Sequence, residues 1–418
     1  MKKILAILLV LVMTFLVACT GTTTTTTTAP VETPTEAETT KTDAETTKTD
    51  EPAEEPTDTE APETDPVEAS TEPAGDSDKT LKIAIVTSPN GVDDGSFNQN
   101  NYEGALAFIE AHSGSTVQAI RERDISNSVP TVENIVADYD VVVTPGFQFA
   151  GVAEIAVNNP EKFFVIIDSF PSEVDGQDTF DNVLGIQFAE QESGFFAGVA
   201  AALQTESNKV AVVNGIAYPS NVNYQFGFES GVHYANKHLG TDVELIELPS
   251  YAGQDVTGAD VGGNYIGSFD DESRGKVLGN ALLAEGVDII FVAAGGAGNG
   301  VFTAVKEAGN AYVIGCDVDQ YDDGVNGDEN IVLTSGLKVM DINVERALNA
   351  VFDGSFKGEN VVLGADTDST GYVHAEGRHQ LTEDTLAELA KVYDLVKDGT
   401  IVPAANFNGH SSDNFPGL

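Results

Sequence analysis

The strongest constraint on this chain is a repeated alternation of short apolar segments with longer amphipathic ones, which begins near residue 79. Residues 81–88, 139–146 and 163–169 are apolar runs of strand length, and stretches of helix length such as 98–111 lie between such runs. Strands that are apolar on both faces belong to parallel sheets with helices on either side. The alternation therefore predicts an α/β fold built from parallel sheets.

Roughly 340 residues follow this pattern, more than one α/β core normally holds, so we expect two Rossmann-like lobes. A second series of strands and helices begins at Lys209 and repeats the plan of the first. We assign residues 79–204 and about 337–358 to lobe 1, and residues 205–336 and about 359–418 to lobe 2. A chain that crosses between two lobes more than once forms a hinge, with a ligand cleft beside it.

Residues 1–19 have the features of a bacterial lipoprotein signal peptide. Lys2 and Lys3 precede an apolar run over residues 4–17, and the letters LVAC end in Cys19. This run is shorter than the about 20 residues of a membrane-spanning helix. We expect cleavage before Cys19 and a fatty acyl group on its sulfur, which would hold the protein on the extracytoplasmic face of the cell membrane. An ordinary secretory signal with an incidental cysteine is the alternative.

Residues 20–78 are rich in Thr, Glu, Pro, Asp and Ala and contain almost no large apolar side chain. Such a segment cannot bury enough apolar surface to fold, so we expect a disordered, acidic tether. The whole chain carries a formal charge of −47. A protein this acidic does not bind nucleic acid through electrostatic attraction, which excludes that class of partner.

The motifs of catalysis and metal binding are incomplete in this chain. No GxSxG elbow or HExxH pair occurs, and the six histidines show no metal-ligand spacing. Residues 317–324 and 366–371 are similar to calcium-binding loops but do not complete the EF-hand pattern, so calcium is a minor alternative. Cys316 has no disulfide partner once Cys19 is acylated, and we expect it to be a small buried side chain at a strand end. The sequence thus predicts no enzyme activity, no metal and no cofactor.

Polar and aromatic residues follow the predicted strands, and ligands of parallel α/β sheets bind at the carboxyl ends of strands. Residues 295–300, with the sequence GGAGNG, lie between a strand and a helix. Their glycines allow the backbone to approach a ligand, and the helix N-terminus offers free N–H donors. A phosphate-binding nucleotide loop and a plain tight turn are the alternatives. The strand ends together predict a polar cleft that also contains stacking surfaces.

From Leu81 to about Tyr372 the chain resembles the basic membrane protein family of bacterial lipoproteins, the purine nucleoside receptor group of substrate-binding proteins. The resemblance lies in eight segments in the family's order, DDGSFNQNNYEG, GFQFA, FFVIID, FAEQESGFFAGVAAAL, IGSFDDESRGK, IIFVAAGGAGNGVF, VIGCDVDQ and VLTSGLK. It implies a type I periplasmic-binding-protein fold and capture of a nucleoside for an ABC permease with its ATPase. We expect the protein to be a monomer.

The resemblance also implies roles for individual residues. Phe97 in the SFN motif and Phe269 in the GSFDD motif would sandwich a purine ring, because flat rings favour offset stacking. Asn98 and Asp168 would read the edge of the base through hydrogen bonds. The alternatives are that the two rings belong to the lobe cores and that Asp168 caps a helix.

The same resemblance places the sugar of the nucleoside near the second series of strands. Asp317 would accept hydrogen bonds from the ribose hydroxyls, and Lys338 with the backbone of Gly295 and Gly296 would complete the sugar site. Asp317 as a helix cap and Lys338 as a solvated or salt-bridged residue are the alternatives.

One residue departs from the family pattern. Where the family commonly has an acid after the first strand, this chain has Ser88, which is short and uncharged. The change is compatible with an altered base preference, with a water in place of the carboxylate, or with a ligand other than a nucleoside. Two other functions stay open: a receptor that senses a sugar or another small signal, and an enzyme that acts on nucleosides through aspartates near Asp317.

Overall fold

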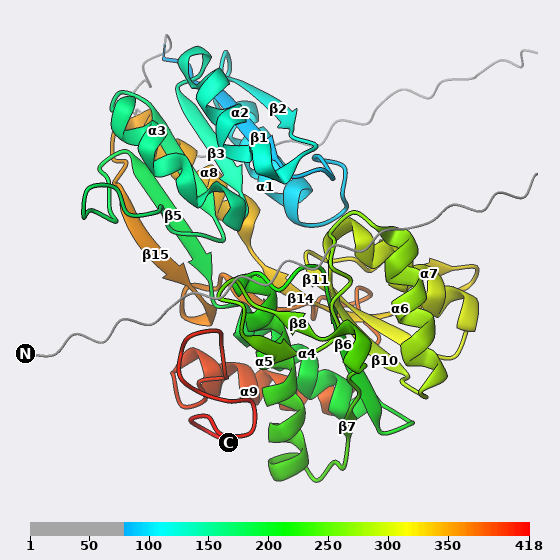
Figure 1. Ribbon diagram of the computed structural model, residues 1–418. Coiled ribbons are helices and arrows are strands. Elements are labelled where there is room, and N and C mark those ends of the chain that lie inside the picture. The colour runs from blue at the N-terminus through cyan, green and yellow to red at the C-terminus, as the bar shows by residue number, and fades with distance from the viewer. Residues whose placement is uncertain (1–78) are drawn as a thin grey trace, which may run out of the picture. The chain divides into compact units, whose positions relative to one another are not determined.

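Residues 79–418 are described by the computed structural model, and they form two six-stranded sheets covered by helices (Figure 1). The predicted signal peptide with Cys19 and the predicted tether, residues 20–78, lie outside the described residues. Within residues 79–418, no helix combines the length and the apolar character that crossing a membrane requires. The prediction of an α/β fold with parallel sheets is confirmed.

The sheet of the first lobe is parallel throughout and has the strand order β15-β5-β4-β3-β1-β2. Its central strands are buried on both faces, because helices α1 and α8 cover one face and α2 and α3 the other. The strands are β1 (Lys82–Thr87), β2 (Thr116–Arg121), β3 (Val141–Pro145), β4 (Phe163–Ile167), β5 (Val183–Phe188) and β15 (Glu359–Leu363). The helices are α1 (Phe97–Ala111), α2 (Ser128–Ile135), α3 (Ala153–Asn158) and α8 (Met340–Asp353).

The sheet of the second lobe has the order β16-β14-β11-β10-β6-β7, and only the edge strand β16 is antiparallel to its neighbour. Helices α4, α5 and α9 cover one face, and α6 and α7 cover the other. The strands are β6 (Lys209–Asn214), β7 (Glu244–Leu245), β10 (Ile289–Ala293), β11 (Tyr312–Asp317), β14 (Val332–Lys338) and β16 (Thr370–Tyr372). The helices are α4 (Glu190–Gln204), α5 (Pro219–Tyr234), α6 (Glu272–Ala284), α7 (Gly298–Ala308) and α9 (Glu383–Lys397).

The chain crosses between the lobes three times: from β5 to α4, from β14 to α8, and from β15 to β16. The predicted lobe boundaries are wrong in two places. Helix α4 was expected in lobe 1, but its apolar surface packs into the core of lobe 2. Residues 359–363 were expected in lobe 2, but they form β15, which pairs with β5 (Figure 1). Lobe 1 thus comprises residues 79–188 and 340–363.

Helices α4 and α5 approach each other through glycines on both sides. A Cβ atom on Gly198 would lie 2.1 Å from the carbonyl oxygen of Phe228, and one on Gly227 would lie 2.1 Å from that of Gln191. Since real Cβ atoms do not approach this closely, these positions require glycine for the backbones to pack. The contact fixes both helices beside the chain crossing at the start of α4.

We predict that Gly198→Ala lowers the free energy of unfolding by about 1–3 kcal/mol, because the added methyl group must push two packed helices apart. This loss occurs although alanine is the better helix former by about 1 kcal/mol. Denaturant-induced unfolding followed by circular dichroism measures the change. Asp394→Ala, on the exposed face of α9, is the matched control and is expected to leave stability within about 0.5 kcal/mol. Equal stability of the two variants would contradict the close-packing explanation.

Candidate ligand-binding site

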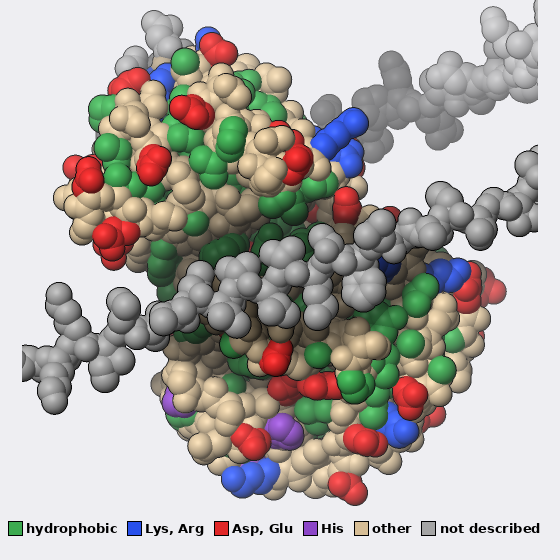
Figure 2. Space-filling model, viewed as in Figure 1, with side chains coloured by type: hydrophobic (Ala, Val, Ile, Leu, Met, Phe, Trp, Pro, Cys, Tyr) green, Lys and Arg blue, Asp and Glu red, His purple; other side chains and the backbone are tan. Residues whose placement is uncertain are grey.

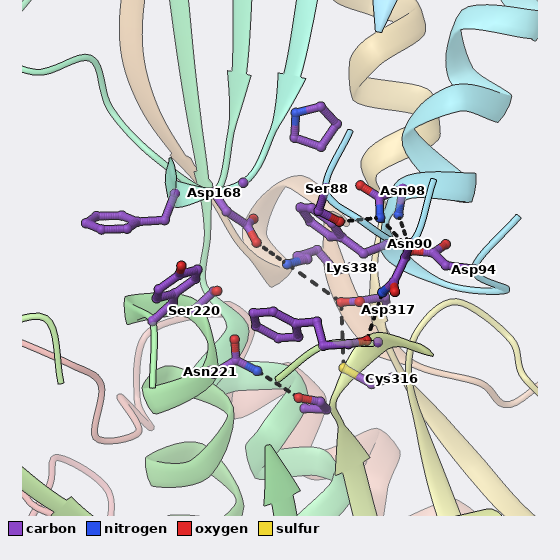
Figure 3. Close-up of a pocket in the computed structure, with 18 of the residues that line it drawn as sticks. Ser88, Asn90, Asp94, Asn98, Asp168, Ser220, Asn221, Cys316, Asp317 and Lys338 are labelled. Carbon is purple, nitrogen blue, oxygen red and sulfur yellow. Dashed lines mark hydrogen bonds and ion pairs between the residues drawn. The ribbon is translucent and has the colours of Figure 1, made fainter. Parts of the chain in front are cut away.

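The carboxyl ends of strands from both sheets meet at one cavity with about 610 Å³ of empty space (Figure 3). On the face shown in Figure 2, the two lobes are separated by a hollow, and acidic side chains are spread over both lobes. Eight of the nine ligand-contacting residues predicted from the sequence line the cavity: Ser88, Phe97, Asn98, Asp168, Phe269, Gly295, Asp317 and Lys338. Their individual roles toward a ligand stay predictions.

Gly296 is the ninth predicted residue; it is buried and does not line the cavity. A Cβ atom on Gly296 would come within 3.3 Å of the Asn90 side chain, so this glycine leaves room for Asn90. Asn90 lies in lobe 1 and donates a hydrogen bond of 2.8 Å from Nδ2 to the carbonyl oxygen of Phe269 in lobe 2. Asn90 lies in the polar segment that follows the first strand, but no sequence motif distinguishes it from its neighbours.

Lys338 is the buried centre of the cavity wall, at the end of β14 (Figure 3). Its Nζ lies 2.7 Å from Oδ2 of Asp168, 3.6 Å from Oε1 of Glu190 and 3.6 Å from Oδ1 of Asp317. Burial alone lowers the pKa of Lys338, but the three carboxylates raise it by more, so the ammonium group stays charged. The side chain is therefore not solvated, but it is salt-bridged, as one of the alternatives held, and its salt bridges connect both lobes.

Asp168 and Asp317 occupy equivalent positions in the two sheets, just after β4 and at the end of β11. Both have left-handed backbone conformations, with φ values of 62° and 69°. Such angles are uncommon for residues other than glycine, and they are held where surrounding contacts enforce them, as at functional sites. Neither residue caps a helix, so the structural alternative considered for them is wrong.

The two aspartates differ in how their oxygens are satisfied. Asp317 accepts hydrogen bonds from Tyr224 Oη at 2.8 Å and from Ser96 Oγ at 3.2 Å. Oδ2 of Asp168 accepts a hydrogen bond from Lys338 Nζ, but Oδ1 of Asp168 is buried and has no hydrogen-bond partner among the described residues. A buried acceptor without a partner is costly, and a donor group of a ligand would relieve that cost. Burial raises the pKa of Asp168, while Lys338 opposes the rise.

Ser88 forms part of a small network around Asn98 at the start of α1. Asn98 Nδ2 donates to Ser88 Oγ at 3.0 Å and to Asp94 Oδ2 at 2.7 Å. Asp94 also accepts hydrogen bonds from the backbone N–H groups of Ser96, Asn98 and Gln99. Burial raises the pKa of Asp94, and these hydrogen bonds oppose the rise without cancelling it. The carboxylate nearest to the Asn98 amide is thus supplied by Asp94, a residue to which the sequence reasoning gave no role.

The aromatic residues of the cavity come from both lobes. The ring of Phe97 lies with its centroid 4.8 Å from Lys338 Nζ, and it also packs against the core of lobe 1. In lobe 2, the rings of Phe269 and Tyr218 are neighbours with centroids 5.8 Å apart, and the ring of Phe147, from lobe 1, lies 5.5 Å from that of Tyr218. Tyr218 and Phe147 belong to strand-end segments that the sequence marks as polar and aromatic, but no spacing rule selected them individually.

Cys316 is buried and lines the cavity, as expected for a small side chain at a strand end. Burial and the neighbouring Asp317 carboxylate raise the pKa of its thiol. In residues 79–418, no three His, Cys, Asp or Glu side chains are grouped as a metal site would require. In the loop after β11 that is similar to a calcium loop, Asp319 and Asp322 instead pair with Arg378 at 2.7 and 2.8 Å.

The chain is similar to known proteins in sequence and in fold. The chain is 30% identical over 345 residues to the CD4+ T-cell-stimulating antigen of Listeria monocytogenes, covering 78% of this chain and 88% of the relative. It is 30% identical over 301 residues to the ABC transporter nucleoside-binding protein BmpA of Lactococcus lactis subsp. cremoris, covering 68% and 78%. An ABC transporter solute-binding protein from Aeropyrum pernix superposes with a TM-score of 0.66 at 24% identity, covering 79% and 94%.

The structural likeness to solute-binding proteins confirms the predicted type I periplasmic-binding-protein fold. The family described as ABC transporter substrate-binding protein PnrA-like matches residues 81–250 and 251–403. Proteins of this kind bind their ligand without transforming it, so the chain is not an enzyme. The chain belongs to the Bmp family of PnrA-like ABC transporter substrate-binding proteins.

Proposed function

We propose that this protein captures a purine nucleoside in the cavity between its lobes and delivers it to an ABC permease and its ATPase. The observation that carries the proposal is that one ring from each lobe, Phe97 and Phe269, lines the same cavity as the buried carboxylates. Flat rings on both sides suit a purine, since offset stacking adds about 0.5–1.5 kcal/mol beyond area burial. The name of the Lactococcus lactis relative, a nucleoside-binding protein, supports the same ligand class.

The polar groups divide the cavity into two regions. Asn98 and Asp168 would bind the edge of the base, and the unpartnered oxygen of Asp168 favours an N–H donor there. Asp317, Lys338 and the backbone at Gly295 would bind the sugar, because carboxylate and ammonium groups together match neighbouring hydroxyls. A ligand that lacks one of these partners would leave a buried polar group unpaired, which is a strong basis for selectivity.

Closure of the lobes around the ligand completes the proposed mechanism. The Asn90 bond to Phe269 and the Ser96 bond to Asp317 join groups of the two lobes, so they can form only when the cleft is closed. Closure would exclude water from the base and the sugar and present a new surface to the permease. We further propose that Cys19 carries the lipid anchor and that residues 20–78 tether a monomeric binding unit on the extracytoplasmic face of the membrane.

We predict that Phe97→Ala and Phe269→Ala each weaken nucleoside binding at least about tenfold, because each removes one stacking surface. Titration calorimetry with adenosine, inosine and guanosine measures the affinities. Tyr312→Ala, which removes an exposed ring at the opposite end of β11, is the control and is expected to bind like the unmodified protein. Unchanged affinity in both cavity variants would refute the sandwich, and binding of sugars in place of nucleosides would refute the ligand class.

A second prediction concerns pH, because burial raises the pKa of Glu190 to about 8 from its ordinary value of 4.5, although Lys338 opposes the rise. The folded protein therefore keeps a proton on Glu190 that the unfolded chain releases above about pH 4.5, and stability falls as pH rises toward 8. Glu190→Gln removes this titration. Relative to the unmodified protein, we expect the variant to gain about 4 kcal/mol in unfolding free energy between pH 5 and pH 8.5.

Denaturant titrations at the two pH values measure this change. Glu376→Gln, at an exposed position, removes one carboxylate from the surface and is expected to show no such pH-dependent gain. A parallel pH response of Glu190→Gln and the unmodified protein would show that Glu190 is ionised in the folded state throughout this range.

A further inference from the structure

A second cavity with about 620 Å³ of empty space adjoins the candidate ligand site. The two cavities share three residues, Phe147, Asp168 and Ser220, and Figure 3 shows Asp168 and Ser220 on the same side of the first cavity. The remaining walls come from the chain crossing, from α5 and from two loops: Gln187, Glu190, Pro219, Asn223, Val256, Asn406 and Phe407. The cleft therefore continues past Asp168 instead of ending there.

Phe407 is the unusual member of this wall. Its side chain is 68% exposed, and its φ of 66° places a large residue in the left-handed region that favours glycine. A bulky residue in this conformation costs about 1–2 kcal/mol, and such strain is retained mainly where a function uses it. An exposed ring at the rim of a cavity is available to pack against a bound group.

Asn406, beside Phe407, adds a polar group to the same wall. Its backbone N–H donates to Asn223 Oδ1 at 2.8 Å, which holds the segment against α5. Its side-chain Nδ2 is buried and has no partner among the described residues. Both Asn406 and Phe407 lie beyond residue 403, where the match to the family ends.

We propose that the second cavity extends the ligand site and receives an apolar substituent on the base of the nucleoside. The inference rests on the proposed function, in which Asp168 binds the edge of the base. A group attached to that edge would pass Asp168 and enter the space between Phe147, Val256 and Phe407, which supply its apolar walls. Position 6 of the purine carries the exocyclic atom from which such a group can extend.

The test compares adenosine, inosine and guanosine, each with its analogue that carries a benzyl group on the exocyclic atom at position 6. Calorimetric titration of the unmodified protein is expected to show that the benzyl analogue of a bound nucleoside binds at least as tightly as its parent. Phe407→Ala should weaken the analogue about tenfold, which corresponds to about 1.4 kcal/mol, and leave the parent unchanged. Phe407→Tyr keeps the ring and should restore the affinity for the analogue.

The outcomes separate the two proposals. Absence of binding by all three parent nucleosides would refute the proposed function. Binding of adenosine together with rejection of its benzyl analogue, which keeps an exocyclic N–H, would refute the extension alone. The benzyl analogues of inosine and guanosine lack the N1–H of their parents, so for these ligands an equal loss of parent and analogue in Phe407→Ala is the refuting outcome. Because Phe407 is exposed, removing its ring deletes no core contact, and thermal unfolding of each variant verifies that it is folded.

Discussion

The buried ammonium group of Lys338 is the constraint on which the site depends. A charge removed from water is tolerated only when opposite charges surround it, and the loss of one partner typically costs about 3–5 kcal/mol. The carboxylates of Asp168 and Asp317 reach this nitrogen from strand ends of lobe 1 and lobe 2, and the carboxyl group of Glu190, whose pKa is raised to about 8, reaches it from the first turn of α4. Since Glu190 and Lys338 also flank two chain crossings, the electrostatic centre of the cavity and the hinge are the same piece of structure.

The same local backbone conformation positions the Asp168 carboxylate in lobe 1 and the Asp317 carboxylate in lobe 2. Asp168 and Asp317 each follow a buried parallel strand, and each turns the chain through a left-handed conformation. The extended backbone of a strand would continue along the sheet, whereas this turn directs the side chain across the sheet end toward the cavity. The family resemblance marked both residues, but the strained geometry that positions them is visible only in three dimensions.

Much of the fold and of the first cavity was predictable because apolar strand runs and strand-end polarity are local signals. The prediction that α4 belongs to lobe 1 was wrong. Small residues such as Gly198 let this helix pack by close backbone contact, and composition alone does not show which of the two lobes provides that contact. Strand β15 was missed because a short edge strand has a weak apolar pattern. Phe147 neighbours Tyr218 and lines the second cavity with Phe407 only in the folded structure, so no sequence spacing connects these residues.

The three crossings have a consequence for how the chain acquires its structure. Lobe 1 needs α8 and β15, and the core of lobe 2 includes Leu389 and Phe415 near the C-terminus. Neither core can close during synthesis until most of the chain has left the ribosome, because each depends on segments made late. An N-terminal fragment that lacks these segments is therefore not expected to be independently stable.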